Sequence, residues 1–226
     1  MIVEFLGISG SGKSFMATQY CHYLGDNGVK YIWPWKSIYA NGYIQRNLKK
    51  SFAVVKMMIT SPNWCFNLFR YLLHQGIYGK RDLPVLFFNG IYLCHAFEKY
   101  GKYDGVALFD EGVAQYIWAI HFRNRKNIKE DEFEEIRSLY NFPQTLYVVT
   151  AKSETILRRM VERNVRDEIR ERGDAMAELE NGQRAVEMVS QALSRKMGDN
   201  VVIIDNNDNG VKDYKRLFEK SLIVSV

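Results

Sequence analysis

The stretch that most constrains the fold is GISGSGKS, residues 7–14, which directly follows the apolar run IVEFL, residues 2–6. Its spacing, G-x-x-x-x-G-K-S, is typical of a loop that binds phosphate through backbone N–H groups. The glycines let the backbone approach a phosphate without a Cβ in the way. Such a loop needs a strand before it and a helix N-terminus after it. The sequence therefore predicts a nucleotide-binding domain that contains β-strands and α-helices.

Two side chains of this loop have separate predicted tasks. Lys13 would reach the β- and γ-phosphates of a nucleotide, and the Ser14 hydroxyl would hold Mg²⁺. The Asn-Lys-x-Asp pattern by which GTPases select guanine is absent from the sequence. The predicted nucleotide-binding residues are Ser9, Gly10, Ser11, Gly12, Lys13, Ser14 and Phe15.

Five short apolar runs predict buried parallel strands with helices between them. The predicted strands are residues 2–6, 29–33, 106–109, 145–150 and 201–205. Helical spacing of apolar residues predicts helices at 14–24, where Gly25 would end the helix, and at 176–197, which the pair Asn181-Gly182 would interrupt. Alternating strands and helices indicate an α/β fold with a parallel sheet.

The middle of the chain, residues 41–102, does not alternate in this way and predicts a helical insert. We expect helices near 46–59, after Ser61-Pro62 and after Pro84. The segment is rich in aromatic residues, which have three interpretations. They form a core of the insert, they line a pocket or lid for an apolar acceptor, or they belong to an amphipathic helix at a membrane surface.

An acidic pair follows the third predicted strand in VALFDEG. An acid at the end of a buried strand beside the first one would face the bound Mg²⁺, so we assign Asp110 to the metal together with Ser14. Glu111 is interpreted as a general base toward a hydroxyl or water, or as an outer group of the metal site.

Arginines are dense in ILRRMVERNVRDEIRERGD, near residues 158–174. Surface ion pairs within a helix contribute only about 0.2–0.5 kcal/mol each, which gives little reason for so many guanidinium groups. Arginines that close over a transferring phosphoryl group stabilise its oxygens and exclude water. We predict this catalytic role for Arg159, Arg163 and Arg166, with a salt-bridged exposed face as the alternative.

Three motifs give the chain a resemblance to the small P-loop kinases of the nucleoside-monophosphate kinase superfamily, thymidylate-kinase-like group. They are EFLGISGSGKS, LYVVTAKSETILRRMVERN with RDEIRERGD in the position of the mobile LID, and VVIIDNND. The resemblance implies a three-layer P-loop NTPase fold with a five-stranded parallel sheet in the order 2-3-1-4-5. It also implies Mg-ATP as the phosphate donor, so the expected cofactors are ATP and Mg²⁺. The same resemblance implies one domain over residues 1–226, with the acceptor region in the insert at 41–102 and a LID at 158–174.

The sequence departs from this group at one position. Thymidylate kinases carry Asp-Arg-aromatic after the third strand, whereas here Glu111 follows Asp110. A carboxylate there would repel an acceptor phosphate at close range. The predicted function is therefore an ATP-dependent kinase (a phosphotransferase) that acts on a small acceptor, a hydroxyl-bearing metabolite or a nucleotide. The aromatic residues that are candidates to stack on that acceptor, or to join the core, are Trp33, Trp35, Tyr39 and Tyr43. The alternative function is a regulatory nucleotide-binding ATPase or switch without a small acceptor.

Charge and cysteine content bear on the partners and the compartment. A mixed net charge of +5 over 226 residues is weak evidence for nucleic acid, so none is expected as a partner. Three widely separated cysteines predict reduced thiols in a cytoplasmic protein. No apolar run is long enough to predict a transmembrane segment, and no signal peptide is expected. A homodimer is compatible with all of these features.

Overall fold

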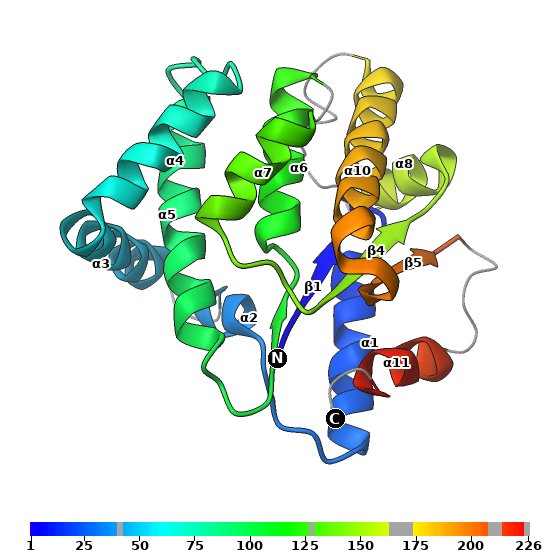
Figure 1. The fold of residues 1–226 in the computed structure, drawn as a ribbon. Coiled ribbons are helices and arrows are strands. Elements are labelled where there is room, and N and C mark those ends of the chain that lie inside the picture. The colour runs from blue at the N-terminus through cyan, green and yellow to red at the C-terminus, as the bar shows by residue number, and fades with distance from the viewer. Residues whose placement is uncertain (40–42, 127–128, 163–173, 208–213, 224–226) are drawn as a thin grey trace.

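Five parallel strands form the centre of the fold, in the order β2-β3-β1-β4-β5 (Figure 1). The computed structural model describes residues 1–226 except 40–42, 127–128, 163–173, 208–213 and 224–226. The strands are β1 (Ile2–Leu6), β2 (Tyr31–Ile32), β3 (Val106–Phe109), β4 (Thr145–Thr150) and β5 (Val201–Asp205). The predicted α/β class, parallel sheet and strand order are confirmed.

The register of β1 decides where the functional loops lie. Glu4 in β1 pairs with Phe109 in β3 on one side and with Leu146 in β4 on the other. All three strands run in the same direction, so their carboxyl ends meet at one edge of the sheet. The loop that follows β1 and the acidic pair that follows β3 therefore come together at that edge.

Helices cover both faces of the sheet, which gives three layers (Figure 1). Helices α1 (Lys13–Asp26) and α11 (Tyr214–Ile223) pack together on one face. Helices α6 (Val113–Asn124) and α10 (Ala175–Met197) pack together on the other. Alternation along β1 serves both layers, because Val3 belongs to the core beneath α1 whereas Ile2 belongs to the core on the opposite face.

The insert between β2 and β3 is helical, as predicted. Its helices are α2 (Pro34–Tyr39), α3 (Tyr43–Thr60), α4 (Pro62–His74) and α5 (Asp82–Tyr100). Buried side chains such as Val54, Leu68 and Ile91 join the same apolar core as the sheet residue Leu6. The remaining described helices are α7 (Glu130–Leu139), α8 (Ser153–Glu162) and a 3₁₀ turn at Gly198–Asn200.

Three predicted boundaries differ from the structure. Strand β2 is limited to Tyr31–Ile32, and α1 continues through Gly25 to Asp26. Helix α10 runs without interruption through Gly182, where we expected a break. The glycine serves packing instead, because a Cβ there would lie 3.2 Å from Ile8 Cγ2. Its carbonyl also accepts a hydrogen bond from Trp118 Nε1 at 2.9 Å.

None of the helices among the described residues has the length and apolar character needed to cross a bilayer.

Candidate active site

The loop after β1 is held in a conformation that favours glycine. Gly10 and Gly12 have φ angles of 82° and 99°. A Cβ on Gly12 would lie 2.0 Å from Asn206 Nδ2, so that position has no room for a side chain. Lys13 Nζ donates to the loop's own carbonyls, to Gly7 O at 2.5 Å and to Ile8 O at 3.2 Å. The ammonium group thus lies where it would meet a phosphate that enters the loop.

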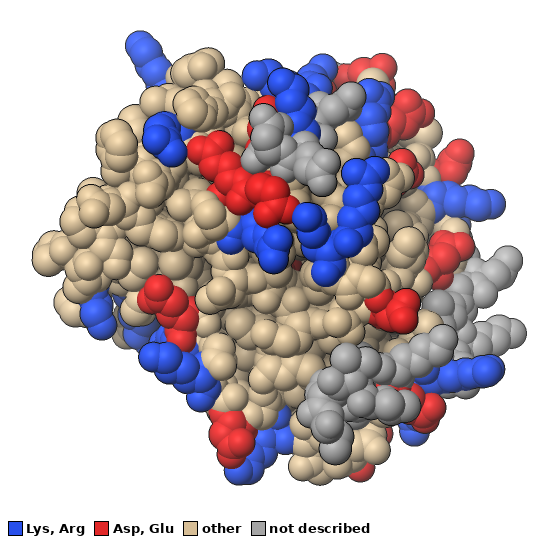
Figure 2. Space-filling view, viewed as in Figure 1, with Lys and Arg blue, Asp and Glu red and all other residues tan. Residues whose placement is uncertain are grey.

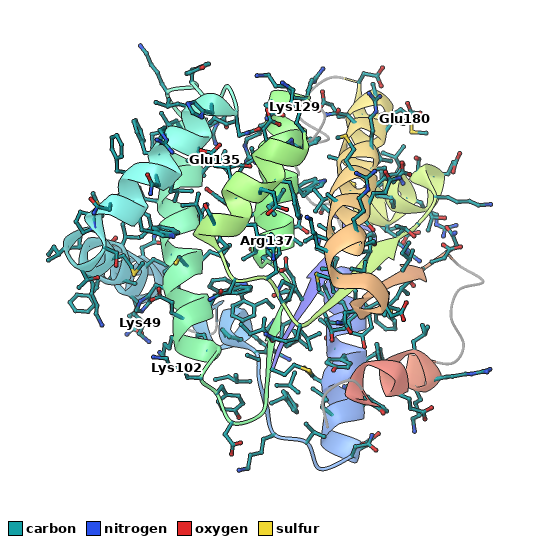
Figure 3. The ribbon with its side chains drawn as sticks, in the orientation of Figure 1. Lys49, Lys102, Lys129, Glu135, Arg137 and Glu180 are labelled. Atoms are coloured by element: carbon teal, nitrogen blue, oxygen red, sulfur yellow. The ribbon has the colours of Figure 1, made fainter. Side chains whose placement is uncertain are left out.

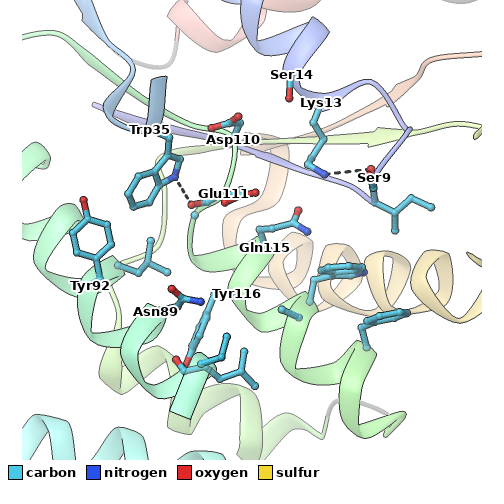
Figure 4. Close-up of a pocket in the computed structure, with 18 of the residues that line it drawn as sticks. Ser9, Lys13, Ser14, Trp35, Asn89, Tyr92, Asp110, Glu111, Gln115 and Tyr116 are labelled. Atoms are coloured by element: carbon cyan, nitrogen blue, oxygen red, sulfur yellow. Dashed lines mark hydrogen bonds between the residues drawn. The ribbon is translucent and has the colours of Figure 1, made fainter. Parts of the chain in front are cut away.

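A cavity of about 580 Å³ opens between this loop, the end of β3, helix α6 and the insert (Figure 4). The predicted site residues that line it are Ser9, Gly10, Gly12, Lys13, Ser14, Asp110 and Glu111. Ser11 is buried instead, with its carbonyl accepting a hydrogen bond from Asn206 Nδ2 at 2.8 Å. Phe15 lies on α1 with 45% of its surface exposed and is not part of the cavity wall.

The acidic pair after β3 is positioned by two tryptophans of the insert side. Trp33 Nε1 donates to the Asp110 carboxylate at 2.9 Å. Trp35 Nε1 donates to the backbone carbonyl of Glu111 at 2.6 Å (Figure 4). Trp35 is buried against Tyr92 and lines the cavity. The side chains of Tyr39 and Tyr43, the other stacking candidates, lie outside the described residues.

The oxygen donors at the loop suit a hard divalent cation. The Ser14 hydroxyl and the Asp110 carboxylate both line the cavity, and Mg²⁺ prefers such oxygen ligands. Within the described part of the chain, no group of three or more His, Cys, Asp or Glu side chains gathers as a metal cage. Mg²⁺ is usually held by one or two protein oxygens together with substrate phosphates, so this donor set fits it.

A buried carboxyl group that sequence reasoning missed lies beneath the site. Glu4 in β1 is fully buried, and its Oε1 accepts a hydrogen bond from the backbone N–H of Gln115 at 2.9 Å. Gly112 leaves it room, since a Cβ there would lie 2.4 Å from Glu4 Cδ. Gln115 Oε1 in turn accepts from the N–H of Gly7 at 3.3 Å. Gln115 therefore connects the Glu4 carboxyl, through its backbone N–H, to the phosphate loop, through its side chain. The only sequence signal was an acid inside an apolar strand.

Burial raises the pKa of Glu4 from 4.5 to about 7, although backbone N–H groups at the start of α6, Gln115 first, lower it.

Because of this raised pKa, the folded protein keeps a proton on Glu4 that the unfolded chain releases above pH 4.5. The contribution of Glu4 to stability is expected to fall as pH rises from 4.5 to about 7 and to level off above that. The total loss is about 3 kcal/mol. Glu4→Gln should lack this decline, as measured by urea unfolding across that pH range. An exposed control, Glu180→Gln, should keep it, and identical pH curves for Glu4→Gln and wild type would refute the assignment.

The far wall of the cavity is polar and aromatic. Helix α5 supplies Asn89 and Tyr92, and helix α6 supplies Gln115 (Figure 4). Arg123 of α6 also lines the cavity. Lys50 of α3 also lines it, with Nζ 5.2 Å from the centre of the Tyr92 ring. Sequence motifs do not single these residues out, because they come from three helices, α3, α5 and α6, that are far apart along the chain.

The arginine segment is described only at its beginning. Arg159 in α8 donates from Nη2 to the carbonyl of Asn206 at 2.9 Å. Asn206 in turn binds the phosphate loop through Ser11, so Arg159 lies at the rear of the loop. Arg163 and Arg166 lie outside the described residues, and their catalytic role stays a prediction.

The three cysteines are free and buried. Burial raises the pKa of the Cys21 thiol to about 11 and that of Cys94 to about 12. Thiols with such pKa values remain protonated near neutral pH, so they are poor nucleophiles.

Comparison with known proteins gives matches at the level of structure alone. No protein-family model and no curated protein sequence matches the chain. The matching solved structures include a thymidylate kinase from Ehrlichia chaffeensis, with 12% identity, a TM-score of 0.47 and coverage of 100% of this chain and 98% of that one. They also include a deoxyadenosine kinase from M. mycoides with dCMP and dCDP bound, with 11% identity, a TM-score of 0.48 and full coverage of both chains.

Proposed function

We propose that the protein is an ATP-dependent phosphotransferase that moves the γ-phosphoryl group to a small acceptor. The observation that carries this proposal is the shared cavity, in which the phosphate loop and Glu111 face side chains of the insert. Its volume of about 580 Å³ lies within the usual range for small-molecule sites. A protein that only binds a nucleotide does not require polar side chains on the cavity wall opposite the phosphate loop.

In this reaction the bond between the γ-phosphorus and the β–γ bridging oxygen breaks, and a bond from the acceptor oxygen to that phosphorus forms. Glu111 would accept the proton that the acceptor hydroxyl releases. Lys13 and the N–H groups of the loop would bind the phosphate oxygens. Ser14 and Asp110 would hold Mg²⁺, which neutralises charge on the phosphates.

The acidic residue at position 111 favours a neutral hydroxyl over a phosphate as the attacking group, because a carboxylate repels a phosphate at short range. The far wall offers amides at Asn89 and Gln115 and the aromatic face of Trp35. A side-chain amide donates hydrogen bonds through its NH₂ group and accepts them through its oxygen, so it can bind hydroxyl and carbonyl groups. An aromatic face packs against a flat or apolar ring. These groups support a hydroxyl-bearing metabolite as the acceptor. A nucleoside or nucleotide also belongs to this class, because it carries hydroxyl groups and a flat ring.

Acceptor-dependent release of ADP tests this function. The purified protein with Mg-ATP is given pooled metabolites, and ADP formation is followed with phosphorylated products identified by mass spectrometry. A pool that stimulates ADP release and yields a phosphorylated acceptor would support the kinase. A steady ATPase rate that no pool changes would favour a regulatory ATPase or switch. A failure to bind Mg-ATP in calorimetry would refute both.

A further inference from the structure

The chain separates its charges along the sequence. The 55 residues from 27 to 81, between Asp26 and Asp82, contain nine Lys and Arg residues and no Asp or Glu. The whole chain has 31 basic and 26 acidic residues, so the rest of it has 22 basic and 26 acidic ones. The basic segment covers α2, α3 and α4. A net charge of +5 therefore conceals a strongly basic insert on a slightly acidic body.

Helix α3 in this segment has two apolar faces. Ala53, Val54 and Met57 are buried and pack into the core. The opposite face exposes a second row, spaced four, three and four residues apart, which we call the α3 stripe. Its members and their exposed fractions are Leu48 65%, Phe52 74%, Val55 53% and Ile59 75%. An exposed apolar row of this kind is typical of an interaction surface.

Basic side chains border the α3 stripe. Lys49 lies three residues before Phe52 and Lys56 four residues after it, so both adjoin that ring on the helix surface. Both lysines are exposed. Lys49 points away from the body of the protein (Figure 3), and the surface over α3 and α4 is largely free of acidic atoms (Figure 2). The adjoining helix α4 adds exposed Phe66.

We propose that the α3 stripe docks on an anionic phospholipid bilayer surface. Apolar side chains of a surface helix enter the boundary between headgroups and acyl chains, while neighbouring lysines bind the anionic headgroups. A second copy of the chain fits less well, because a symmetric interface would bring two basic inserts against each other. The basic, acid-free composition of the segment is what selects an anionic surface.

Vesicle co-sedimentation tests this proposal with the full chain. We expect at least about tenfold more protein on vesicles of equimolar phosphatidylglycerol and phosphatidylcholine than on phosphatidylcholine alone, with binding that weakens as salt is added. Phe52→Ser combined with Ile59→Ser should lower binding about tenfold or more. Lys49→Ala combined with Lys56→Ala should lower binding to the anionic vesicles only. All four side chains are exposed, so the variants should keep the wild-type circular dichroism and Tm.

Matched controls distinguish binding through the α3 stripe from nonspecific adsorption to vesicles. Val161→Ser combined with Ile203→Ser removes two exposed apolar side chains elsewhere, and Lys152→Ala combined with Lys215→Ala removes two exposed charges elsewhere. Both should bind like wild type. Equal binding to neutral and anionic vesicles, absence of binding, or unchanged binding of the stripe variants would overturn the proposal. A dimer in sedimentation analysis that the Phe52→Ser, Ile59→Ser variant dissociates, without any vesicle binding, would assign the stripe to a second copy instead.

Discussion

Lys13→Ala is expected to lower phosphotransfer by at least about 10²–10³-fold and to weaken ATP binding. In the structure the ammonium group donates to two carbonyls inside the phosphate loop. Phosphate oxygens are stronger acceptors than carbonyls and would take over these hydrogen bonds. Alanine leaves the loop backbone in place but removes its only long cationic side chain. Single-turnover kinetics and calorimetry with Mg-ATP would measure both effects.

Lys30→Ala is the matched control, because Lys30 pairs with Asp104 at the exposed surface. It should retain wild-type turnover and ATP affinity. Normal turnover by a folded Lys13→Ala protein would remove the phosphate loop from the catalytic account.

Glu111→Gln is expected to reduce the rate of phosphotransfer by about 10²–10⁴-fold if this side chain takes the proton from the acceptor. Glutamine keeps the size of the side chain but does not accept a proton near neutral pH. The backbone at this position is held by Trp35 through the carbonyl, which the substitution leaves unchanged. ATP affinity should therefore remain close to that of wild type, while the chemical step slows.

Pre-steady-state measurement of product formation separates these two quantities. Glu180→Gln, at an exposed position of α10, controls for the loss of one negative charge. A Glu111→Gln enzyme with a nearly normal chemical step would return Glu111 to an outer position around the metal.

The strands and the meeting of the two loops were predictable from local patterns. Four of the five apolar runs coincide with observed strands. For β1, β3 and β4 the reason is that a strand buried on both faces leaves a continuous apolar signal. The parallel arrangement then brings Asp110 to the edge where Lys13 lies. Strand β2 pairs with β3 through Tyr31 and Ile32 alone, so the apolar residues Val29 and Trp33 at either end of the predicted run lie outside the sheet.

The missed residues owe their positions to contacts that are remote in sequence. Glu4 is buried because the start of α6, some hundred residues later, supplies N–H groups to it. Asn206 reaches the phosphate loop across 195 residues. Asn89 and Arg123 line the same cavity only because α5 and α6 both border it. Periodicity and motif spacing describe neighbours along the chain, so they contain no signal for such pairs.

Asn206 has a consequence for how this chain tolerates change. One amide connects the phosphate loop to the end of β5, and the carbonyl of the same residue receives the guanidinium of Arg159 from α8. The phosphate loop is thus attached through the Asn206 side chain, whereas α8 is attached through the backbone of the same residue. A substitution of Asn206 would therefore detach the loop but leave the carbonyl that accepts from Arg159, so evolution can alter the support of the loop without altering the position of α8.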